Sequence, residues 1–381
     1  MCRLAMKTAI NPFSPFSVLE AMEAMQEGYD GSGLGLLLRG LEFGDFGYKS
    51  TDPILSGIAH TEEALHRLNK FMQDNGFELK YDHEFETDLR EIESRDERFK
   101  YFLRVYKIPQ AWKGFDQGRI EEELMMTRVK LRLDGEGHGD DLTVFSFWPD
   151  VAMIKEVGWP LTVGKALGIN DDRIKARVVM AQGRQNTNWG INLYACHPFF
   201  IQGVATMTNG ENTAFLPIKE WLIGQRHPGY MGYQSDSEVF AHILHYTLKK
   251  LKLPLEAYKH IITPLKTEEL VNHPQGAFLR GLRDVCRRLI IDGPNCVMGS
   301  LPDETCLMVM DHKKLRPATI GGKDGEWALA SEMCGIDAMI PDRDRTLDYQ
   351  PMREHTVVVP PHRKEYVIWS QFDPYPLTQA A

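Results

Sequence analysis

The 381-residue chain lacks the features that mark several classes of protein. No apolar run approaches the roughly 18 residues that a membrane-spanning helix needs, so an integral membrane protein is not expected. Basic residues are not in excess either, since 44 Lys and Arg stand against 53 Asp and Glu. Nucleic acids and anionic membrane surfaces are therefore not expected as partners, because binding to them requires positive charge.

Cysteine is scarce, and no two cysteines form a CxxC pair. This argues against a disulfide framework and against a zinc ribbon. The N-terminal residues MCRLAMKTAI also lack the basic start and long apolar stretch of a secretion signal, which favours a cytoplasmic location. The six cysteines are Cys2, Cys196, Cys286, Cys296, Cys306 and Cys334.

The remaining composition, 43% hydrophobic and 25% charged, is typical of a globular protein. Helical spacing and capping signals predict helices over 17–28, with a Ser17–Glu20 capping box, and over 61–76, with Thr61 as the cap. Apolar runs predict a buried strand at 34–38. Further helices are expected at 217–224, 238–251 and 268–285. Further strands are expected at 177–181, 202–207, 288–291, 305–310, 327–330, 356–359 and 365–369. Because most of these strands follow one another without alternating helices, an α+β layered fold is favoured over a doubly wound sheet.

Residues 77–158 are highly charged, and short strand-like runs interrupt them. No linker rich in Pro, Gly or Ser marks either edge of this segment. We therefore interpret residues 1–381 as one domain that carries a charged insertion at about 77–158.

A glycine-rich stretch, Gly31-Ser32-Gly33-Leu34-Gly35, resembles a dinucleotide-binding loop in composition. Such a loop needs a strand before it and a helix after it, whereas here the expected helix comes first. A tight turn from helix to strand is the favoured interpretation.

Glu238, His242 and His245 share one face of a predicted helix, which is compatible with a metal site. The apolar residues between them favour a helix packed on the core with its histidines at the flank. Because no further ligand cluster is evident nearby, no metal is expected, and a metal hydrolase is the weakest of the functional hypotheses.

Two positions, Cys2 and Arg184, carry side chains that could take part in catalysis or ligand binding. Cys2 follows the initiator methionine, which cells normally remove before a small residue, so that the mature chain would begin with a thiol beside a free amine. Arg184 lies in AQGRQNTNW, a loop expected after a strand. An arginine there is either a solvated surface residue or a clamp that holds a carboxylate through two hydrogen bonds.

Two further segments allow both a structural and a functional interpretation. Asn209-Gly210 is a common turn dipeptide, yet an Asn amide beside a Gly N–H can also donate two hydrogen bonds to an oxyanion. Asp236 lies between Ser235 and Glu238, which have capping-box spacing. It is either part of a helix start or a carboxylate that faces a substrate ammonium group.

Together these residues resemble the class II glutamine amidotransferases, which are N-terminal-nucleophile enzymes, and most of all the amidotransferase domain of glutamate synthase. The landmarks follow one another in the family's order over nearly the whole chain. They are Cys2, the turn at 27–33, Arg184, Asn209-Gly210-Glu211, Ser235-Asp236-Ser237-Glu238, Asp292-Gly293-Pro294, Leu315-Arg316-Pro317, Ala330-Ser331-Glu332 and Gly335-Ile336-Asp337.

The resemblance implies a four-layer αββα sandwich and a role for each site residue. Cys2 would attack the side-chain amide of L-glutamine, with its own α-amino group as the base. Asn209 and Gly210 would form the oxyanion hole. Arg184 would hold the α-carboxylate of glutamine, and Asp236 would hold its α-ammonium group.

The sequence departs from the family at four positions around these residues. Glu27 replaces the arginine of the early turn, and Gln182 replaces a histidine before the arginine loop. Asn186 replaces a serine after Arg184, and Thr208 replaces the histidine before Asn-Gly. The predicted nucleophile, clamp and oxyanion residues are all present, so activity is expected.

The resemblance also implies a division of labour between subunits. The flavin-binding barrel and the iron–sulfur cysteine clusters of a glutamate synthase are not expected here, because the six cysteines are dispersed along the chain, so no cofactor is expected in it. It would act as a glutaminase subunit that passes ammonia to a partner carrying FMN and iron–sulfur clusters, with 2-oxoglutarate as the acceptor. The alternative is a catalytically idle scaffold subunit of a related complex such as N-methylglutamate synthase.

Overall fold

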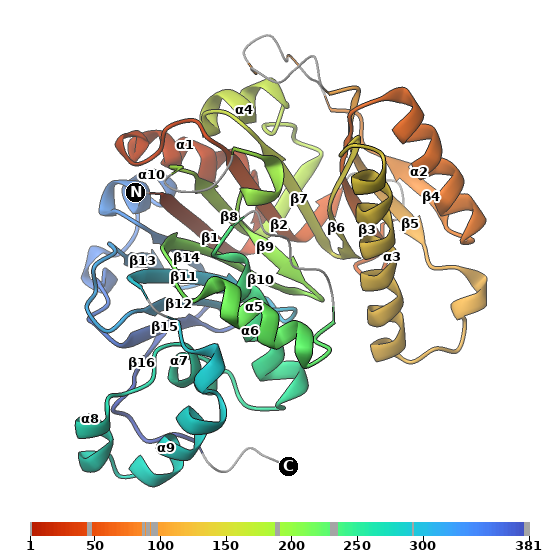
Figure 1. The fold of residues 1–381 in the computed structure, drawn as a ribbon. Coiled ribbons are helices and arrows are strands. Elements are labelled where there is room, and N and C mark those ends of the chain that lie inside the picture. The colour runs from red at the N-terminus through yellow and green to blue at the C-terminus, as the bar shows by residue number, and fades with distance from the viewer. Residues whose placement is uncertain are drawn as a thin grey trace.

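Two β-sheets lie face to face at the centre of the protein, with helices on their outer sides (Figure 1). The structure is a computed structural model that describes residues 2–43, 48–85, 88, 92, 98–186, 191–228, 235–291 and 293–376. All pairings between its named strands are antiparallel. This agrees with the predicted α+β fold class.

The larger sheet has ten strands in the order β13-β14-β1-β8-β2-β7-β6-β3-β5-β4. Its central strand β8 pairs with β1 on one side and β2 on the other. The strands are β1 (Arg3–Phe13), β2 (Leu34–Phe43), β3 (Pro53–Ala59), β4 (Glu78–Asp82), β5 (Lys100–Lys107), β6 (Leu142–Pro149), β7 (Val151–Glu156), β8 (Ile174–Gly183), β13 (Thr319–Lys323) and β14 (Glu326–Ala330). The predicted strands at 34–38, 177–181 and 327–330 are confirmed within it.

The smaller sheet has six strands in the order β16-β15-β12-β11-β10-β9. The strands are β9 (Phe199–Ile201), β10 (Val204–Gly210), β11 (Asn295–Ser300), β12 (Cys306–Met310), β15 (His355–Val359) and β16 (Val367–Ser370). The predicted strands at 202–207, 305–310, 356–359 and 365–369 all correspond to members of this sheet.

Alternation along the strands of the smaller sheet divides its apolar residues between two cores. Met207, Met298 and Met308 belong to the core shared with the larger sheet. Val204 and Val297 belong to a separate core beneath the outer helices. Because side chains alternate along a strand, central strands such as β10 and β11 contribute to both cores, and the two sheets are held together by the first.

The outer face of the larger sheet is covered by α1 (Phe16–Ala24), α4 (Pro160–Ala166) and α10 (Met333–Met339). The predicted Ser17–Glu20 capping box of the first helix is wrong, because α1 begins one residue earlier and the Ser17 hydroxyl instead donates to the Ser14 carbonyl. The helix α2 (Glu62–Asp74) is capped by Thr61, whose hydroxyl accepts from the amide of Ala64, as predicted.

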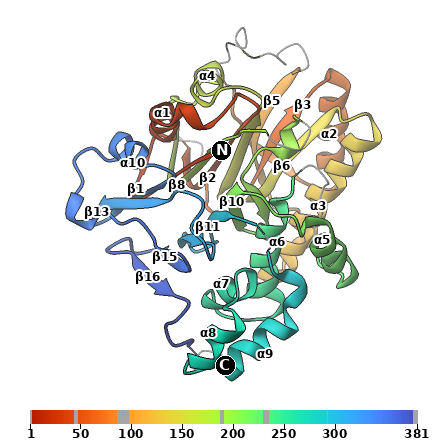
Figure 2. The ribbon, with the colours of Figure 1, turned by 60° about the vertical axis from the view of Figure 1, so that its left-hand side comes forward.

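The outer face of the smaller sheet is covered by helices that gather in the lower part of Figure 2. They are α5 (Phe215–Gly224), α6 (Glu238–His245), α7 (Glu256–Ile262), α8 (Thr267–Asn272) and α9 (Gly276–Val285). With α1, α4 and α10 on the other side, they complete the four αββα layers, which confirms the predicted fold.

Three predicted elements of this region differ in the structure. The helix at 238–251 is α6 followed by a π-helical turn, Tyr246–Lys250. The helix at 268–285 is split into α8 and α9, because Pro274 cannot continue the hydrogen bonding of α8. The strand at 288–291 is wrong, since Arg287–Leu289 forms a 3-10 turn.

The charged segment 77–158 contributes β4, β5, β6 and β7 to the larger sheet, together with the long helix α3 (Gln117–Gly137). The guanidinium of Arg128 on α3 donates to the Phe200 carbonyl of β9 over 2.8 Å. The segment is therefore built into the sheet and contacts the edge of the smaller one. No helix in the described parts of the chain is long and apolar enough to cross a membrane.

Candidate functional site

Cys2 lies immediately before β1, which lies between β14 and β8 inside the larger sheet. Arg3, the first residue of β1, is paired with Gly183 at the end of β8. The Sγ atom of Cys2 accepts a hydrogen bond from the backbone amide of Gln185 over 3.3 Å and lies 3.6 Å from the carbonyl oxygen of the same residue. Strand pairing thus fixes the predicted nucleophile against the loop that carries Arg184.

The surroundings of Cys2 favour a protonated thiol. Burial raises the pKa of Cys2 above its ordinary value, while the amide of Gln185 and the guanidinium of Arg184 act in the opposite direction. A thiol in this state needs a base to remove its proton before it attacks an electrophile.

Arg184 lies in the loop directly after β8, as the sequence predicts, and it is buried and therefore not a solvated surface residue. Its backbone amide donates to the Gly33 carbonyl over 2.8 Å, and its carbonyl accepts from the amide of Asp30 over 3.2 Å. Its Nη2 donates to Oδ1 of Asn186 over 3.1 Å. These bonds tie the arginine loop to the turn at 30–33, so the guanidinium sits on a supported backbone. Residues 187–190 of the loop lie outside the described residues.

Gln182, one of the departures from the family pattern, bridges the two sheets. Its Nε2 donates to the Thr208 carbonyl on β10 over 3.0 Å, and its Oε1 accepts from the amide of His197 over 3.3 Å. The Nδ1 atom of His197 accepts in turn from the amide of Thr208 over 3.0 Å. Burial holds the pKa of His197 well below its usual range, so this ring is neutral.

His197 was not singled out by the sequence. The ring follows a loop and precedes a cis X-Pro bond, and no spacing rule connects it with Gln182 or Thr208. Its role in positioning β10 becomes visible only from the pairing of segments that are far apart in the chain.

Asn209 and Gly210 are the last two residues of β10, where they pair with Cys296 and Asn295 of β11. The structural alternative considered for them, a turn, is therefore wrong. A Cβ atom on Gly210 would lie 2.2 Å from Oδ1 of Asn295 and 2.4 Å from the Pro294 carbonyl oxygen. Only glycine fits this position without a shift of the neighbouring strand.

The side chain of Asn209 faces the larger sheet, because it follows the same alternation as Ala205 and Met207 of the shared core. It is 1% exposed, and its Nδ2 has no hydrogen-bond partner among the residues that the structure describes. A buried amide donor without an acceptor is costly unless a ligand supplies one.

Asp236 lies just before α6 and is buried. Its Oδ2 accepts from the backbone amide of Asn212 over 2.6 Å, and its Oδ1 accepts from the Ser237 hydroxyl over 3.2 Å. Burial raises the pKa of Asp236. The bond to Asn212 connects the carboxylate with the end of β10, two residues beyond Gly210.

The predicted capping box at the start of α6 is wrong. Ser237 occupies the N-cap without a side-chain cap, and the Ser235 hydroxyl accepts from the amide of Ser237 over 3.2 Å. The serines therefore shape the turn that carries Asp236 and do not cap the helix. Residues 229–234, which precede this turn, lie outside the described residues.

The predicted site residues thus form two connected groups at one end of the two sheets. One group joins Cys2 to the Arg184 loop, and the other joins Asn209 and Gly210 to Asp236. The bond from Gln182 to Thr208 links the groups, and β1 contacts β10 across the core. Hydrogen bonds and strand pairing thus connect the segments that carry the predicted thiol, cation, amide donor and carboxylate.

The three residues considered for a metal do not form a ligand set. His242 shares a hydrogen bond of 3.0 Å with His227, and His245 shares one of 2.6 Å with the Gln202 side chain. Glu238 instead faces the cations of Arg132 and Arg128, which lower its pKa against the larger effect of burial. Within the described residues, no group of three His, Cys, Asp or Glu side chains is arranged to hold a metal ion.

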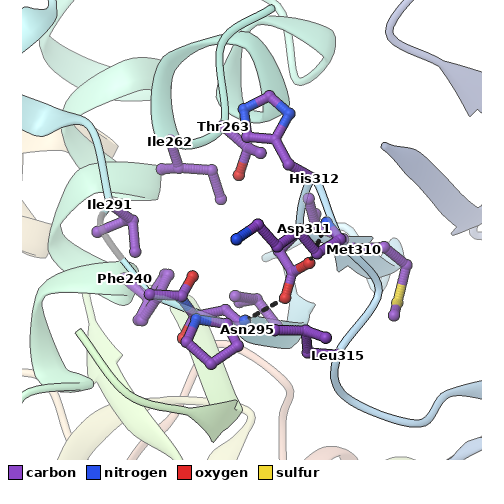
Figure 3. Close-up of a pocket in the computed structure, with 14 residues that line it drawn as sticks. Phe240, Ile262, Thr263, Ile291, Asn295, Met310, Asp311, His312 and Leu315 are labelled. Atoms are coloured by element: carbon purple, nitrogen blue, oxygen red, sulfur yellow. Dashed lines mark hydrogen bonds between the residues drawn. The ribbon is translucent and has the colours of Figure 1, made fainter. Parts of the chain in front are cut away.

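A cavity of about 220 Å³ borders this site on the side of the outer helices (Figure 3). Asn295, the pairing partner of Gly210, lies in its wall, and Oδ2 of Asp311 accepts from the Asn295 amide over 2.6 Å. Phe240 of α6 and Ile262 of α7 form an apolar part of the same wall (Figure 3). The end of β11 is thus held by a buried carboxylate.

The sequence of the chain was compared with protein-family models and with curated proteins. No protein-family model matches the sequence. An uncharacterized protein of Archaeoglobus fulgidus is 26% identical over 303 residues, which cover 78% of this chain and 75% of that protein.

Solved structures of low sequence identity also align with the chain. A glutamine phosphoribosylpyrophosphate amidotransferase from B. subtilis, complexed with ADP and GMP, is 12% identical with a TM-score of 0.49 over 97% of this chain. A glutamine aminotransferase class-II domain protein from Silicibacter pomeroyi is 13% identical with a TM-score of 0.34 over 59% of this chain and 86% of that one. The chain spans about half the length of the B. subtilis protein, 49% of which is covered.

Proposed function

We propose that the chain is a class II glutamine amidotransferase that hydrolyses L-glutamine to glutamate and ammonia, with Cys2 as the nucleophile. The observation that carries this proposal is the side chain of Asn209. It is a buried amide donor without an acceptor among the described residues. It lies on the face of β10 that packs against the larger sheet, and β1 of that sheet directly follows Cys2. A developing oxyanion is the acceptor that such a donor stabilises most.

The reaction begins at the Cys2 thiol once Met1 has been removed. The α-amino group of Cys2 takes the thiol proton as Sγ attacks the side-chain carbonyl carbon of glutamine. An α-amine has a reference pKa of about 7.7–8.0, which suits a base that works near neutral pH. A base is needed here because burial raises the pKa of the thiol.

The tetrahedral intermediate then carries its negative charge on the former amide oxygen. Nδ2 of Asn209 and the backbone N–H of Gly210 donate to this oxygen. Its collapse breaks the C–N bond, and the departing nitrogen takes a proton from the α-ammonium group of Cys2 and leaves as ammonia. Water then hydrolyses the thioester, which releases glutamate and restores the thiol.

The two charged residues of the site select glutamine among simple amides. Arg184 pairs with the α-carboxylate of glutamine and Asp236 with its α-ammonium group, so that both ends of the amino-acid moiety are held. Two hydrogen bonds support the proposal, because they hold these residues in place: the Arg184 amide donates to the Gly33 carbonyl, and the Asn212 amide donates to the Asp236 carboxylate.

We further propose that the released ammonia passes to a partner subunit of the glutamate synthase type. That partner would carry FMN and iron–sulfur clusters and use 2-oxoglutarate as the acceptor. The support for this form is the order of landmarks in the sequence, which includes Leu315-Arg316-Pro317 and Ala330-Ser331-Glu332 after the smaller sheet begins.

Release of glutamate from glutamine by the purified chain tests the proposal. Cys2→Ala should lower the rate by at least about 1,000-fold, because the nucleophile is lost. Cys334→Ala is the matched control, since Cys334 is the other half-exposed cysteine of the described chain and should leave the rate unchanged. Equal rates in wild type and Cys2→Ala would contradict the mechanism. No turnover by either protein would favour the scaffold alternative.

A further inference from the structure

A second cavity, of about 470 Å³, lies on the opposite side of the segment that connects β12 with β13. Lys314 and Arg316 line it from this connecting segment, Ser331 and Glu332 from the end of β14, and Gln350 from a third side. The amide of Leu4 donates to the Ser331 hydroxyl over 3.0 Å. The wall of the cavity is therefore bonded to β1 two residues after Cys2.

The connecting segment is held in place by Asp311. Its Oδ1 accepts from the backbone amides of Lys313 and Lys314 over 2.7 and 2.6 Å, and its Oδ2 accepts from Asn295. Lys314 adopts a left-handed backbone conformation, with φ of 51°, which is uncommon for a residue with a side chain. The segment thus presents Lys314 and Arg316 from a fixed backbone.

The cations that line this cavity have no anionic partners among the residues that the structure describes. Neither Lys314 nor Arg316 forms an ion pair within the described chain, although the protein carries a net charge of −9. The Nε atom of Arg316 is buried and has no hydrogen-bond partner there. A guanidinium with a dehydrated, unpaired donor is stabilised by an incoming acceptor oxygen.

The one carboxylate in the wall is already neutralised. Oε1 of Glu332 pairs with Nη2 of Arg3 over 2.6 Å, and Nε and Nη1 of Arg3 are buried without partners among the described residues. Counting Arg3, Lys314 and Arg316 against Glu332, the cavity and its immediate wall hold an excess of positive charge.

We propose that this cavity binds a small oxyanion, a carboxylate or phosphate compound, with Arg316 and Lys314 as its principal contacts. Arginine pairs with such groups through two parallel hydrogen bonds, and the nearby lysine adds a second positive charge. This site goes beyond the proposed glutamine site and does not depend on it, since glutamine hydrolysis uses none of these side chains.

Isothermal titration of the full chain with succinate and with inorganic phosphate tests the site. The expected result is saturable binding of at least one of them with one site per chain and a Kd of about 1 mM or tighter. Whichever of the two anions binds more tightly shows whether the natural ligand of the cavity is a carboxylate or a phosphate compound. Arg316→Gln should weaken this binding at least tenfold, by about 1.4 kcal/mol.

Three further variants separate this site from its surroundings. Lys314→Gly removes a charge while keeping a residue that tolerates the left-handed backbone, and should also weaken binding. Lys313→Gln is the matched control, because Lys313 lines the other cavity, and it should leave the Kd unchanged. Arg184→Gln should also leave it unchanged, which distinguishes this site from a carboxylate bound in the proposed glutamine site.

Two results would overturn the proposal. One is the absence of saturable binding of either probe up to about 10 mM, a concentration at which a built site of this kind is occupied. The other is binding that persists in both Arg316→Gln and Lys314→Gly while their thermal unfolding remains that of wild type. Binding lost only in Arg184→Gln would assign the anion to the glutamine site instead.

Discussion

The backbone amide of Gln185 donates a hydrogen bond to the sulfur of Cys2, although the two residues are 183 positions apart in the sequence. The contact exists because β1 and β8 are antiparallel neighbours in the larger sheet, so that the start of β1 lies beside the end of β8. The thiol is thereby placed beside Arg184 by strand register alone. Any change that shifts this register is expected to separate the nucleophile from the substrate clamp.

Asn209→Ala tests the proposed oxyanion hole. Loss of one such donor should lower kcat/KM for glutamine by about 100- to 1,000-fold, because the hydrogen bond strengthens as charge develops on the amide oxygen. Thermal stability should change little, since Nδ2 has no partner to lose among the described residues. Thr208→Val is the control on the opposite face of the same strand and should keep near-wild-type activity. Equal activity of Asn209→Ala and wild type would remove Asn209 from the mechanism.

Asp236→Asn tests recognition of the substrate ammonium group. A lost charge-assisted hydrogen bond should raise KM by about 10- to 100-fold. Because burial raises the pKa of Asp236 above 3.8, its carboxylate becomes protonated at a higher pH than an exposed aspartate. KM of the wild type should therefore rise as the pH falls toward that pKa. A pH profile of KM checks this, and the acid limb should be absent from the Asn variant. A limb that survives the substitution would belong to another group.

Glu156→Gln tests the buried ion pair between Arg98 and Glu156, which lies within the charged segment at the end of β7. Glu156 is fully buried, and Arg98 contacts its two oxygens over 2.8 and 3.0 Å. Removing one charge of a buried pair typically costs about 3–5 kcal/mol, because the other charge is left without compensation. Chemical denaturation should show this loss. Glu78→Gln, which breaks an exposed pair with Lys107, should cost less than about 1 kcal/mol. Similar losses in both variants would contradict a special role for Glu156.

Lys155→Met tests the buried ammonium group of β7. Its Nζ donates to the Cys196 carbonyl over 2.5 Å, and burial lowers its pKa to about 7. Between about pH 7 and 10.5, the unfolded chain therefore binds more protons at this residue than the folded chain does. The free energy of unfolding of the wild type should rise with pH in this window, relative to the Met variant, by up to about 1.4 kcal/mol per pH unit.

Denaturation of both proteins at pH 7, 8 and 9 measures this difference. Lys107→Met is denatured in parallel as the control, because it removes an ammonium group that is about half exposed. A constant difference between Lys155→Met and wild type at all three values would show that Lys155 stays charged when buried.

Local signals predicted much of the fold. Thr61 and the helix after it, the apolar run from Leu34, and most strands of the smaller sheet were found because capping, alternation and turn residues act over short distances. The split between α8 and α9 was visible in principle, since Pro274 stands at the break. The 3-10 turn at Arg287–Leu289 was not, because the short apolar run that begins at Leu289 fits a strand as well as a turn.

The site was only partly predictable, because its geometry depends on distant pairing. Asn209-Gly210 has the composition of a turn, yet β11 arrives 85 positions later and keeps the dipeptide in a strand, where only glycine fits against Asn295. The bridge formed by Gln182 and His197 has no sequence signature. Likewise, strand-like runs were recognised within the charged residues 77–158, but the sequence did not show that they join the larger sheet as strands buried on both faces.

The central claim is that Cys2 is an N-terminal nucleophile with a working glutamine pocket. Mass spectra of the intact protein and of its peptides, before and after exposure to an electrophilic glutamine analogue, test this most directly. The account predicts a chain that lacks Met1 and carries a single adduct on Cys2, and excess glutamine should prevent the adduct from forming. A chain that retains Met1, or a processed chain whose Cys2 remains unlabelled, would contradict it.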